Sequence, residues 1–220
     1  TDMSEILSEK VLNFLEENQQ YHYDMTLELA QIPAPSNKEE KRAAWVKNYF
    51  DSLGATQSYI DDALNVVLPL NCDGCDEITV FMAHMDVVFP DETPLPLEVG
   101  DGKVFCPGIC DDTANLTALL LITKYIMEND ISAKKGVLIV ANTGEEGLGN
   151  LKGSRQIMED YKGRIKELIS FDGTFGFVCN DAVGSHRYSV EIKTEGGHSY
   201  GNFGNRNAIA FLSSMINTLY

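Results

Sequence analysis

The first part of the chain carries apolar residues at helical spacing. A helix is predicted over residues 3–18 because its apolar residues fall along one side: Met3, Leu7, Val11 and Phe14. A shorter helix is predicted near residues 25–31, where the prolines of Ile32-Pro33-Ala34-Pro35 stop it. The beginning of the chain is therefore expected to be helical.

A third helix is predicted between Glu39 and Gly54. Ser36 and Glu39 have the spacing of a capping box, in which a serine and a glutamate three residues later cap the start of a helix. Gly54 is a typical residue at a helix end. The apolar residues between them recur with the helical period: Val46, Tyr49, Phe50 and Leu53.

Apolar runs bounded by turn residues predict strands in the middle of the chain. They cover residues 57–60, 65–70, 77–83, 137–142 and 168–171. Two helical segments lie among them, one at 116–122, which is apolar nearly all round, and one at 154–162. Strands that alternate with helices indicate an α/β fold, with a mostly parallel or mixed sheet that has helices on both faces.

The pattern changes after Asn180-Asp181. Residues 187–193 alternate like a half-exposed strand, and residues 207–220 are predicted to be helical. One strand and one helix cannot bury their apolar faces alone, so we expect the chain to stop inside a second domain. A second polypeptide or another copy of the chain is then expected to cover one side of the last helix, formed by Ile209, Leu212 and Ile216.

Composition narrows the classes of protein that these elements can form. The 220 residues are 44% hydrophobic and 23% charged, as in an ordinary soluble globular protein. A formal net charge of −16 argues against nucleic acids and anionic membranes as partners. The first residues include acidic side chains and no apolar run reaches membrane-spanning length, so we expect a cytoplasmic protein.

Five cysteines, an odd number without a disulfide pattern, fit a reducing compartment. Cys72 and Cys75 have the spacing of half a zinc knuckle, but no second pair with a matching gap accompanies them. Asp73-Gly74 between them is a turn dipeptide. We therefore expect a connecting turn rather than a structural zinc site.

Acidic residues and one histidine follow three of the predicted strands and open one predicted helix. In an open α/β sheet, ligands bind outside the carboxyl ends of the strands. Four separate pieces of chain can therefore deliver oxygen and nitrogen ligands to one crevice. The residues concerned are His84, Asp86, Asp111, Asp112, Glu145, Glu146 and Asp172.

Each motif has a plainer interpretation when taken alone. The His-x-Asp motif can be a core histidine beside a turn aspartate, and the Asp-Asp pair can cap a helix. The Glu-Glu pair can be a solvated loop, and Asp172 can be a turn residue. However, neighbouring residues point in different directions, so one of the two glutamates can bind metal while the other takes a proton from zinc-activated water. The occurrence of all four motifs at one sheet edge favours a metal hydrolase.

The ordered set of motifs resembles the M20 metallopeptidase family, which also includes deacylases of N-acyl amino acids. The resemblance runs from about Met25 to the last residue, and the stretch 107–116 is most similar to the tripeptide aminopeptidase branch. It implies a zinc-binding catalytic domain, here residues 1–182 and incomplete, followed by the start of an α+β lid domain at 183–220. The motifs are Ala-His-Met-Asp at 83–86, Pro-Gly-Ile-Cys-Asp-Asp at 107–112, Gly-Glu-Glu-Gly at 144–147, Phe-Asp-Gly at 171–173 and Gly-Gly-His-Ser at 196–199.

The resemblance also implies roles for individual residues and a cofactor of two zinc ions, with Co²⁺ or Mn²⁺ as alternatives. One ion would be held by His84, Asp111 and Asp172. Asp111 would bridge to a second ion held by Glu146. The catalytic residues would be Asp86, which orients the metal-binding histidine, Glu145, the general base, and His198, which stabilises the oxyanion from the lid.

Two departures from the family pattern bear on function. Thr113 stands where many relatives have lysine, and no histidine in the chain matches the family's last metal ligand. We expect a zinc peptidase that acts as an aminopeptidase on di- or tripeptides. The sequence does not define which substrate side chain it prefers. The alternatives are an N-acyl amino acid deacylase and a catalytically incomplete metal-binding module. The expected partners are a short peptide or N-acyl amino acid, and either a second subunit bound through the lid or a missing carboxyl-terminal part.

Overall fold

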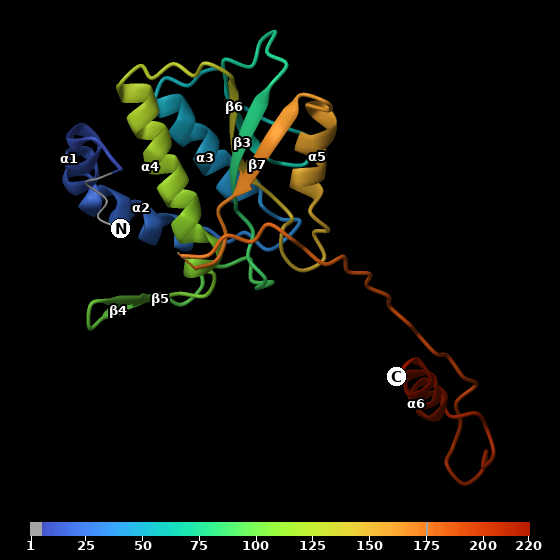
Figure 1. The fold of residues 1–220 in the computed structure, drawn as a ribbon. Coiled ribbons are helices and arrows are strands. Elements are labelled where there is room, and N and C mark those ends of the chain that lie inside the picture. Colours follow the sequence, from blue (N-terminus) through green and yellow to red (C-terminus); the bar gives the residue numbers. More distant parts are fainter. Residues whose placement is uncertain (1–5, 175) are drawn as a thin grey trace. The chain divides into compact units, whose positions relative to one another are not determined.

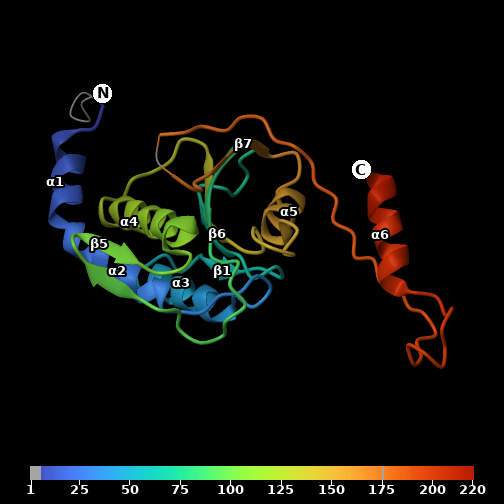
Figure 2. The same ribbon diagram turned by 90° about the horizontal axis from the view of Figure 1, so that it is seen from below.

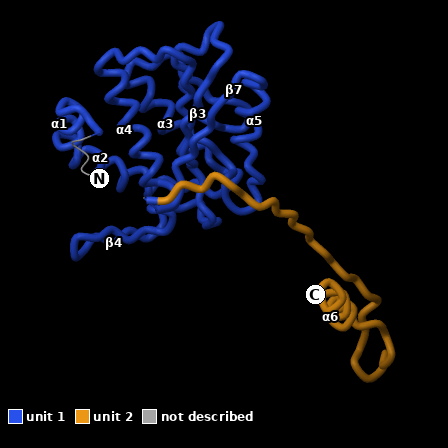
Figure 3. The backbone as a smooth tube through the Cα atoms, in the orientation of Figure 1, with its two compact units in different colours: residues 1–176 blue, residues 177–220 orange. Residues whose placement is uncertain are grey.

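The computed structural model describes residues 6–174 and 176–220, so the predicted start of the first helix lies outside the described residues. The chain divides into two compact units, residues 1–176 and residues 177–220 (Figure 3). This division lies near the predicted domain boundary at 182/183. The assignment of the two parts as catalytic and lid domains stays a prediction.

The first unit is built around a five-stranded mixed sheet (Figure 1). Its strands lie in the order β1 (Tyr59–Ile60), β2 (Val66–Leu70), β6 (Gly136–Asn142), β3 (Ile78–His84) and β7 (Ile165–Ser170). β1 and β2 are antiparallel to their neighbours, whereas β6, β3 and β7 run parallel. His84 pairs with Asn142 and Met82 with Ser170, so the three parallel strands end at one edge.

Helices cover both faces of the sheet (Figures 1 and 2). On one face lie α2 (Gln19–Ala30), α3 (Glu40–Ser52) and α4 (Ala114–Glu128), with α1 (Glu9–Glu17) beside α2. On the other lies α5 (Lys152–Asp160), whose Ile157 is buried against the strands. The predicted α/β fold with a mixed sheet is therefore confirmed.

Alternation along the strands explains the two cores. Successive strand residues point to opposite faces, so Val80 and Met82 pack with Ile157, whereas Ala83 packs on the α3 and α4 side. The larger core joins three helices to the sheet through Leu29, Val46, Phe50, Leu68, Leu116, Leu120 and Ile139, among others. Most apolar residues of α4 are buried in this core, although Ile122 is exposed.

The predicted capping box is wrong, although the helix it announced is present as α3. Glu39 is the N-cap residue, but its side chain makes no capping hydrogen bond. The Ser36 hydroxyl donates instead to Asp86 Oδ2 at 2.7 Å. Glu39 Oε1 likewise accepts from the Gly144 N–H at 3.1 Å, so both side chains bind loops at the carboxyl edge of the sheet.

A hairpin was not predicted. It consists of β4 (Glu98–Gly100) and β5 (Lys103–Phe105), which pair in antiparallel fashion. Asp101 and Gly102 form its turn with φ of 51° and 70°, the left-handed pair typical of a tight hairpin. Each strand has only three residues, too few for a periodic signal. Cys72 and Cys75 do lie in the expected turn, where the Cys75 N–H donates to the Cys72 carbonyl at 3.3 Å.

The second unit contains α6 (Ala208–Leu219), which confirms the last predicted helix. The strand predicted at 187–193 is wrong, since this segment belongs to no sheet in the described part of the chain. A strand is stable only beside a hydrogen-bonded neighbour, which sequence alternation alone does not provide. Among the described helices, none is both long and apolar enough to cross a membrane.

Candidate metal centre

The carboxyl edge of the parallel strands carries the site. His84 is the last residue of β3, and Asp86 follows two residues later. The loop 144–147 follows β6, and Asp172 follows β7. Asp111 and Asp112 lie in an irregular helical turn, η2 (Ile109–Thr113), directly before α4. The topology therefore brings all four predicted segments of the first unit to one place.

His84 is buried, and both of its ring nitrogens face acidic residues. Nδ1 lies 2.9 Å from the backbone oxygen of Asp86 and 3.6 Å from its Oδ1. Nε2 lies 3.1 Å from Asp111 Oδ1. A proton on Nδ1, donated to the backbone oxygen of Asp86, would leave Nε2 as the nitrogen that binds a metal ion, as in histidines that bind metal.

The local electrostatics favour positive charge at this point. Burial opposes a charge on His84, but the hydrogen bond to Asp86 and the nearby carboxylates of Asp112 and Glu145 raise its pKa to about 10. Burial likewise opposes the charge of Asp86, but hydrogen bonds from His84, Ser36 and the Glu146 N–H keep its pKa below the usual range.

Asp111 and Asp112 differ although they are neighbours joined by a cis peptide bond. Asp112 is buried, and both of its oxygens accept hydrogen bonds. Oδ2 accepts from the His84 N–H at 3.0 Å, and Oδ1 accepts from Asn115 Nδ2 at 2.6 Å. The Asp111 side chain is 58% exposed and directs Oδ1 at the imidazole of His84. Burial raises the pKa of Asp112 to about 7.

The Glu145-Glu146 pair is half-buried and held by its backbone. The N–H groups of Glu145 and Glu146 donate to the two oxygens of Asp86, at 3.1 and 2.9 Å. Burial and neighbouring carboxylates raise the pKa of both glutamates, with Asp172 acting on Glu145 and Asp111 on Glu146. Asp86 thus connects the two glutamates to His84.

The donor set fits a divalent cation. Ligand atoms of His84, Asp112 and Asp172 all lie within 4.8 Å of one another, and those of His84, Glu145 and Glu146 form a second such group. One imidazole surrounded by carboxylates matches the ligands of Zn²⁺, Co²⁺ and Mn²⁺. Burial is the main cause of the raised pKa of both glutamates, repulsion by neighbouring carboxylates adds to it, and a bound cation would oppose both effects.

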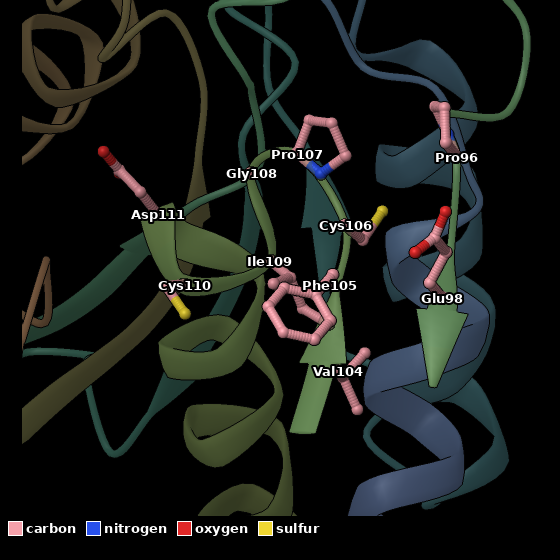
Figure 4. Close-up of a pocket in the computed structure, with 10 residues that line it drawn as sticks. All are labelled: Pro96, Glu98, Val104, Phe105, Cys106, Pro107, Gly108, Ile109, Cys110 and Asp111. Atoms are coloured by element: carbon pink, nitrogen blue, oxygen red, sulfur yellow. The ribbon is translucent and has the colours of Figure 1, made fainter. Parts of the chain in front are cut away.

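An open pocket of about 620 Å³ adjoins the cluster (Figure 4). Phe105 and Ile109 lie in the middle of its lining, and Glu98 and Asp111 lie at opposite sides in this view. The remaining lining residues are Pro96, Val104, Cys106, Pro107, Gly108 and Cys110. The pocket is therefore largely apolar, and the only ionised side chains among these lining residues are acidic.

His198 belongs to the second unit, whereas the other predicted site residues belong to the first. It is exposed, and its Nδ1 accepts the N–H groups of Tyr200 and Gly201, both at 3.2 Å. Its predicted catalytic role stays a prediction.

Sequence reasoning missed three residues that support the site. Ser36 and Glu39 were interpreted as helix caps. Asn115 was missed altogether, although its Nδ2 connects Asp112 with the carbonyl of Gly173 at 3.0 Å, next to Asp172. The available signal was a short polar side chain in the first turn of a largely apolar helix, three residues after the aspartate that it contacts.

Comparisons with known proteins agree with this arrangement. Residues 80–216 match the model of peptidase family M20/M25/M40. No curated protein matches the chain. A tripeptidase from Staphylococcus aureus is 24% identical with a TM-score of 0.57, over 71% of this chain and 44% of that one.

Two further solved structures have the same fold. Aminopeptidase PepT from Bacillus cereus is 22% identical, with a TM-score of 0.56 over 71% of this chain and 44% of that one. Human carnosine dipeptidase 1 is 15% identical, with a TM-score of 0.62 over 77% of this chain and 42% of that one. The chain spans less than half the length of these three proteins. Since the family model covers well over half of the chain, the chain belongs to peptidase family M20/M25/M40.

Proposed function

We propose that this chain carries catalytic residues of a metal-dependent hydrolase that cleaves the amide bonds of short peptides, as an aminopeptidase acting on di- or tripeptides. The convergence of His84, Asp111 and Glu145 at one sheet edge is the observation that carries the proposal. Similar structures described as a tripeptidase, an aminopeptidase and a dipeptidase support it.

Asp111, rather than Asp112, is the proposed metal ligand. Zinc bonds of about 2.0–2.1 Å place two donors of a tetrahedral site roughly 3.3 Å apart. The distance of 3.1 Å between His84 Nε2 and Asp111 Oδ1 is close to this value. Both Asp112 oxygens already accept hydrogen bonds. His84, Asp111 and Asp172 would hold one ion, and Asp111 and Glu146 a second, with Zn²⁺ proposed and Co²⁺ or Mn²⁺ as alternatives.

When bound, a divalent ion would polarise the scissile carbonyl and lower the pKa of the attacking water. Glu145 accepts the proton of that water and passes it to the nitrogen of the departing amine. Its raised pKa, caused by burial and by Asp172, brings the carboxylate closer to the basicity that this transfer requires. Asp86 holds His84 in one tautomer. His198 would stabilise the oxyanion from the proposed lid domain, residues 183–220.

The lining of the pocket favours a peptide with a free amino terminus as the substrate. A volume of about 620 Å³ lies within the range typical of small-ligand sites. Its apolar lining suits an uncharged side chain, and the carboxylate of Glu98 suits an ammonium group.

A substrate panel tests the proposal. Tripeptides, the same peptides with an acetylated amino terminus, and N-acetyl amino acids would be compared with the whole gene product and added zinc. We expect hydrolysis of the free tripeptides, with release of the first residue. Faster cleavage of the N-acetyl amino acids would instead identify a deacylase. Absence of any hydrolysis, with zinc bound, would contradict both.

A further inference from the structure

Three consecutive backbone N–H groups in the glutamate loop are held by two buried carboxylates. Asp86 accepts from Glu145 and Glu146, as described above. Glu39 Oε1 accepts the third, from Gly144, at 3.1 Å. The conformation of this loop therefore depends on two carboxylates that come from other parts of the chain.

Glu39 is fully buried, and its charge has a partner. Its Oε2 accepts from Lys152 Nζ at 2.9 Å, and its Oε1 also accepts from the Asn37 N–H at 2.8 Å. A buried carboxylate is costly unless it is paired and hydrogen-bonded. Although Glu39 is the N-cap residue of α3, its carboxylate binds the loop that carries the proposed general base and makes no capping hydrogen bond.

The segment from Ala34 to Glu39, which we call the brace, also contacts the loop that follows β3. The Ala34 carbonyl accepts the Val87 N–H at 2.9 Å, and the Ser36 hydroxyl donates to Asp86. One end of the brace is thus attached to the His84–Val87 loop, and the other end to the Gly144–Gly147 loop. These two loops carry one proposed ligand of each metal ion.

We propose that Ser36 and Glu39 are positioning residues that set the distance between His84 and the Glu145-Glu146 pair, and hence the affinity for the second metal ion. This inference rests on the metal roles in the proposed function. Ser36 acts through Asp86, whose carboxylate it orients, and Glu39 acts through Gly144 and Lys152.

Zinc titration of the chain against a chromophoric chelator tests the inference, with Glu39→Gln and Ser36→Ala as variants. Glu40→Gln is the matched control, because Glu40 is the next residue along and is exposed. Replacing a residue that supports a metal ligand typically weakens metal affinity by about 10–100-fold. We expect a loss of that size for the second equivalent of zinc in both variants, the first equivalent being retained. The Ser36→Thr variant, which keeps the hydroxyl, should bind the second equivalent of zinc as the parent does.

Amide hydrogen exchange measured without metal separates failure of the inference from failure of the proposed function. We expect faster exchange at Gly144–Glu146 in both variants, with little change in the strands of the sheet. If the parent bound no zinc, the proposed metal ligands would be wrong. Faster exchange confined to Gly144–Glu146 in the variants would still show that the brace positions this loop. If the Glu39→Gln variant does not fold, the comparison of Ser36→Ala with Ser36→Thr tests the inference.

Two results would overturn the inference. One is unchanged exchange at Gly144–Glu146 in a folded variant. The other is equal weakening of both zinc equivalents together with faster exchange throughout the sheet, which would indicate that the brace merely stabilises the fold.

Discussion

Two groups of residues at the site differ in how they are held. The inner group, His84, Asp86 and Asp112, is buried and connected by hydrogen bonds within the chain. The outer group, Asp111, Glu146 and Asp172, is exposed or half-buried. Hydrogen bonds within the chain therefore hold the inner group, whereas the outer carboxylates lie nearer to solvent, where a bound cation would reduce the repulsion between them.

The largest effect is expected at Glu145, which lies between the two groups. Removing a general base typically costs about 10²–10⁴-fold in rate. Glu145→Gln in the whole gene product should lose kcat by such a factor and keep its metal. Glu146→Ala should instead weaken the second metal. Elemental analysis beside steady-state kinetics measures both, and equal metal loss in the two variants would show that the roles are wrongly assigned.

His84→Ala should remove the tighter equivalent of zinc, because the imidazole is the one nitrogen donor of the cluster. We expect a loss of affinity beyond the ~10–100-fold typical of supporting residues. The measurement is the zinc content after dialysis against a weak chelator. Zinc retained as well by this variant as by the parent would contradict the site.

Asp111→Asn and Asp112→Asn sharpen the contrast between outer and inner groups. If Asp111 binds metal directly, its replacement should cost more zinc affinity than the replacement of Asp112, which acts through His84 and should cost about 10-fold. Competition titrations of both variants provide the comparison. The reverse order would make Asp112 the ligand, as its position within the closer cluster with Asp172 would allow.

The smallest effect concerns pH. Burial raises the pKa of Asp112 from 3.8 to about 7, so the folded chain binds a proton that the unfolded chain has already lost. Stability should therefore fall as pH rises from about 4 to about 7. His84 adds no pH dependence below its unfolded pKa of about 6.5, because the stability that its raised pKa confers is fully present there and is lost only at higher pH.

Thermal unfolding in chelator between pH 4.5 and 6.5 measures this fall. The asparagine of the Asp112→Asn variant cannot ionise, so the stability of this variant should fall less with rising pH than that of the parent. The remainder should persist, because burial raises the pKa of Glu145 and Glu146 in the same sense. A pH dependence identical to that of the parent would show that Asp112 is not the group concerned.

Much of the fold was predictable from the sequence, since periodicity and turn residues mark elements that depend on local pattern. The α/β class, the third helix and the meeting of His84 with the Glu145-Glu146 pair all follow from strand ends sharing one edge. The strand at 187–193 was not predictable in this way, because pairing depends on a neighbour elsewhere in the structure.

The supporting residues were harder to predict for a related reason. Ser36 and Glu39 match a capping box in sequence, but side chains take whichever partners tertiary structure offers. Those partners, Asp86 and Gly144, lie far along the chain. Likewise the sequence does not distinguish Asp111 from Asp112, whose difference in burial arises only when β3 and α4 pack together.

Because β3, β6 and β7 end at one edge of the sheet, metal binding at that edge depends on folding. Ligands drawn from residues 84, 111, 146 and 172 lie far apart in the unfolded chain, so the proposed site exists only in the folded state. By mass action, free metal at about 100 times its Kd would stabilise that state by about 2.7 kcal/mol. The midpoint of thermal unfolding should therefore rise with metal concentration, and a cell's metal supply would help to set how much of this protein persists folded.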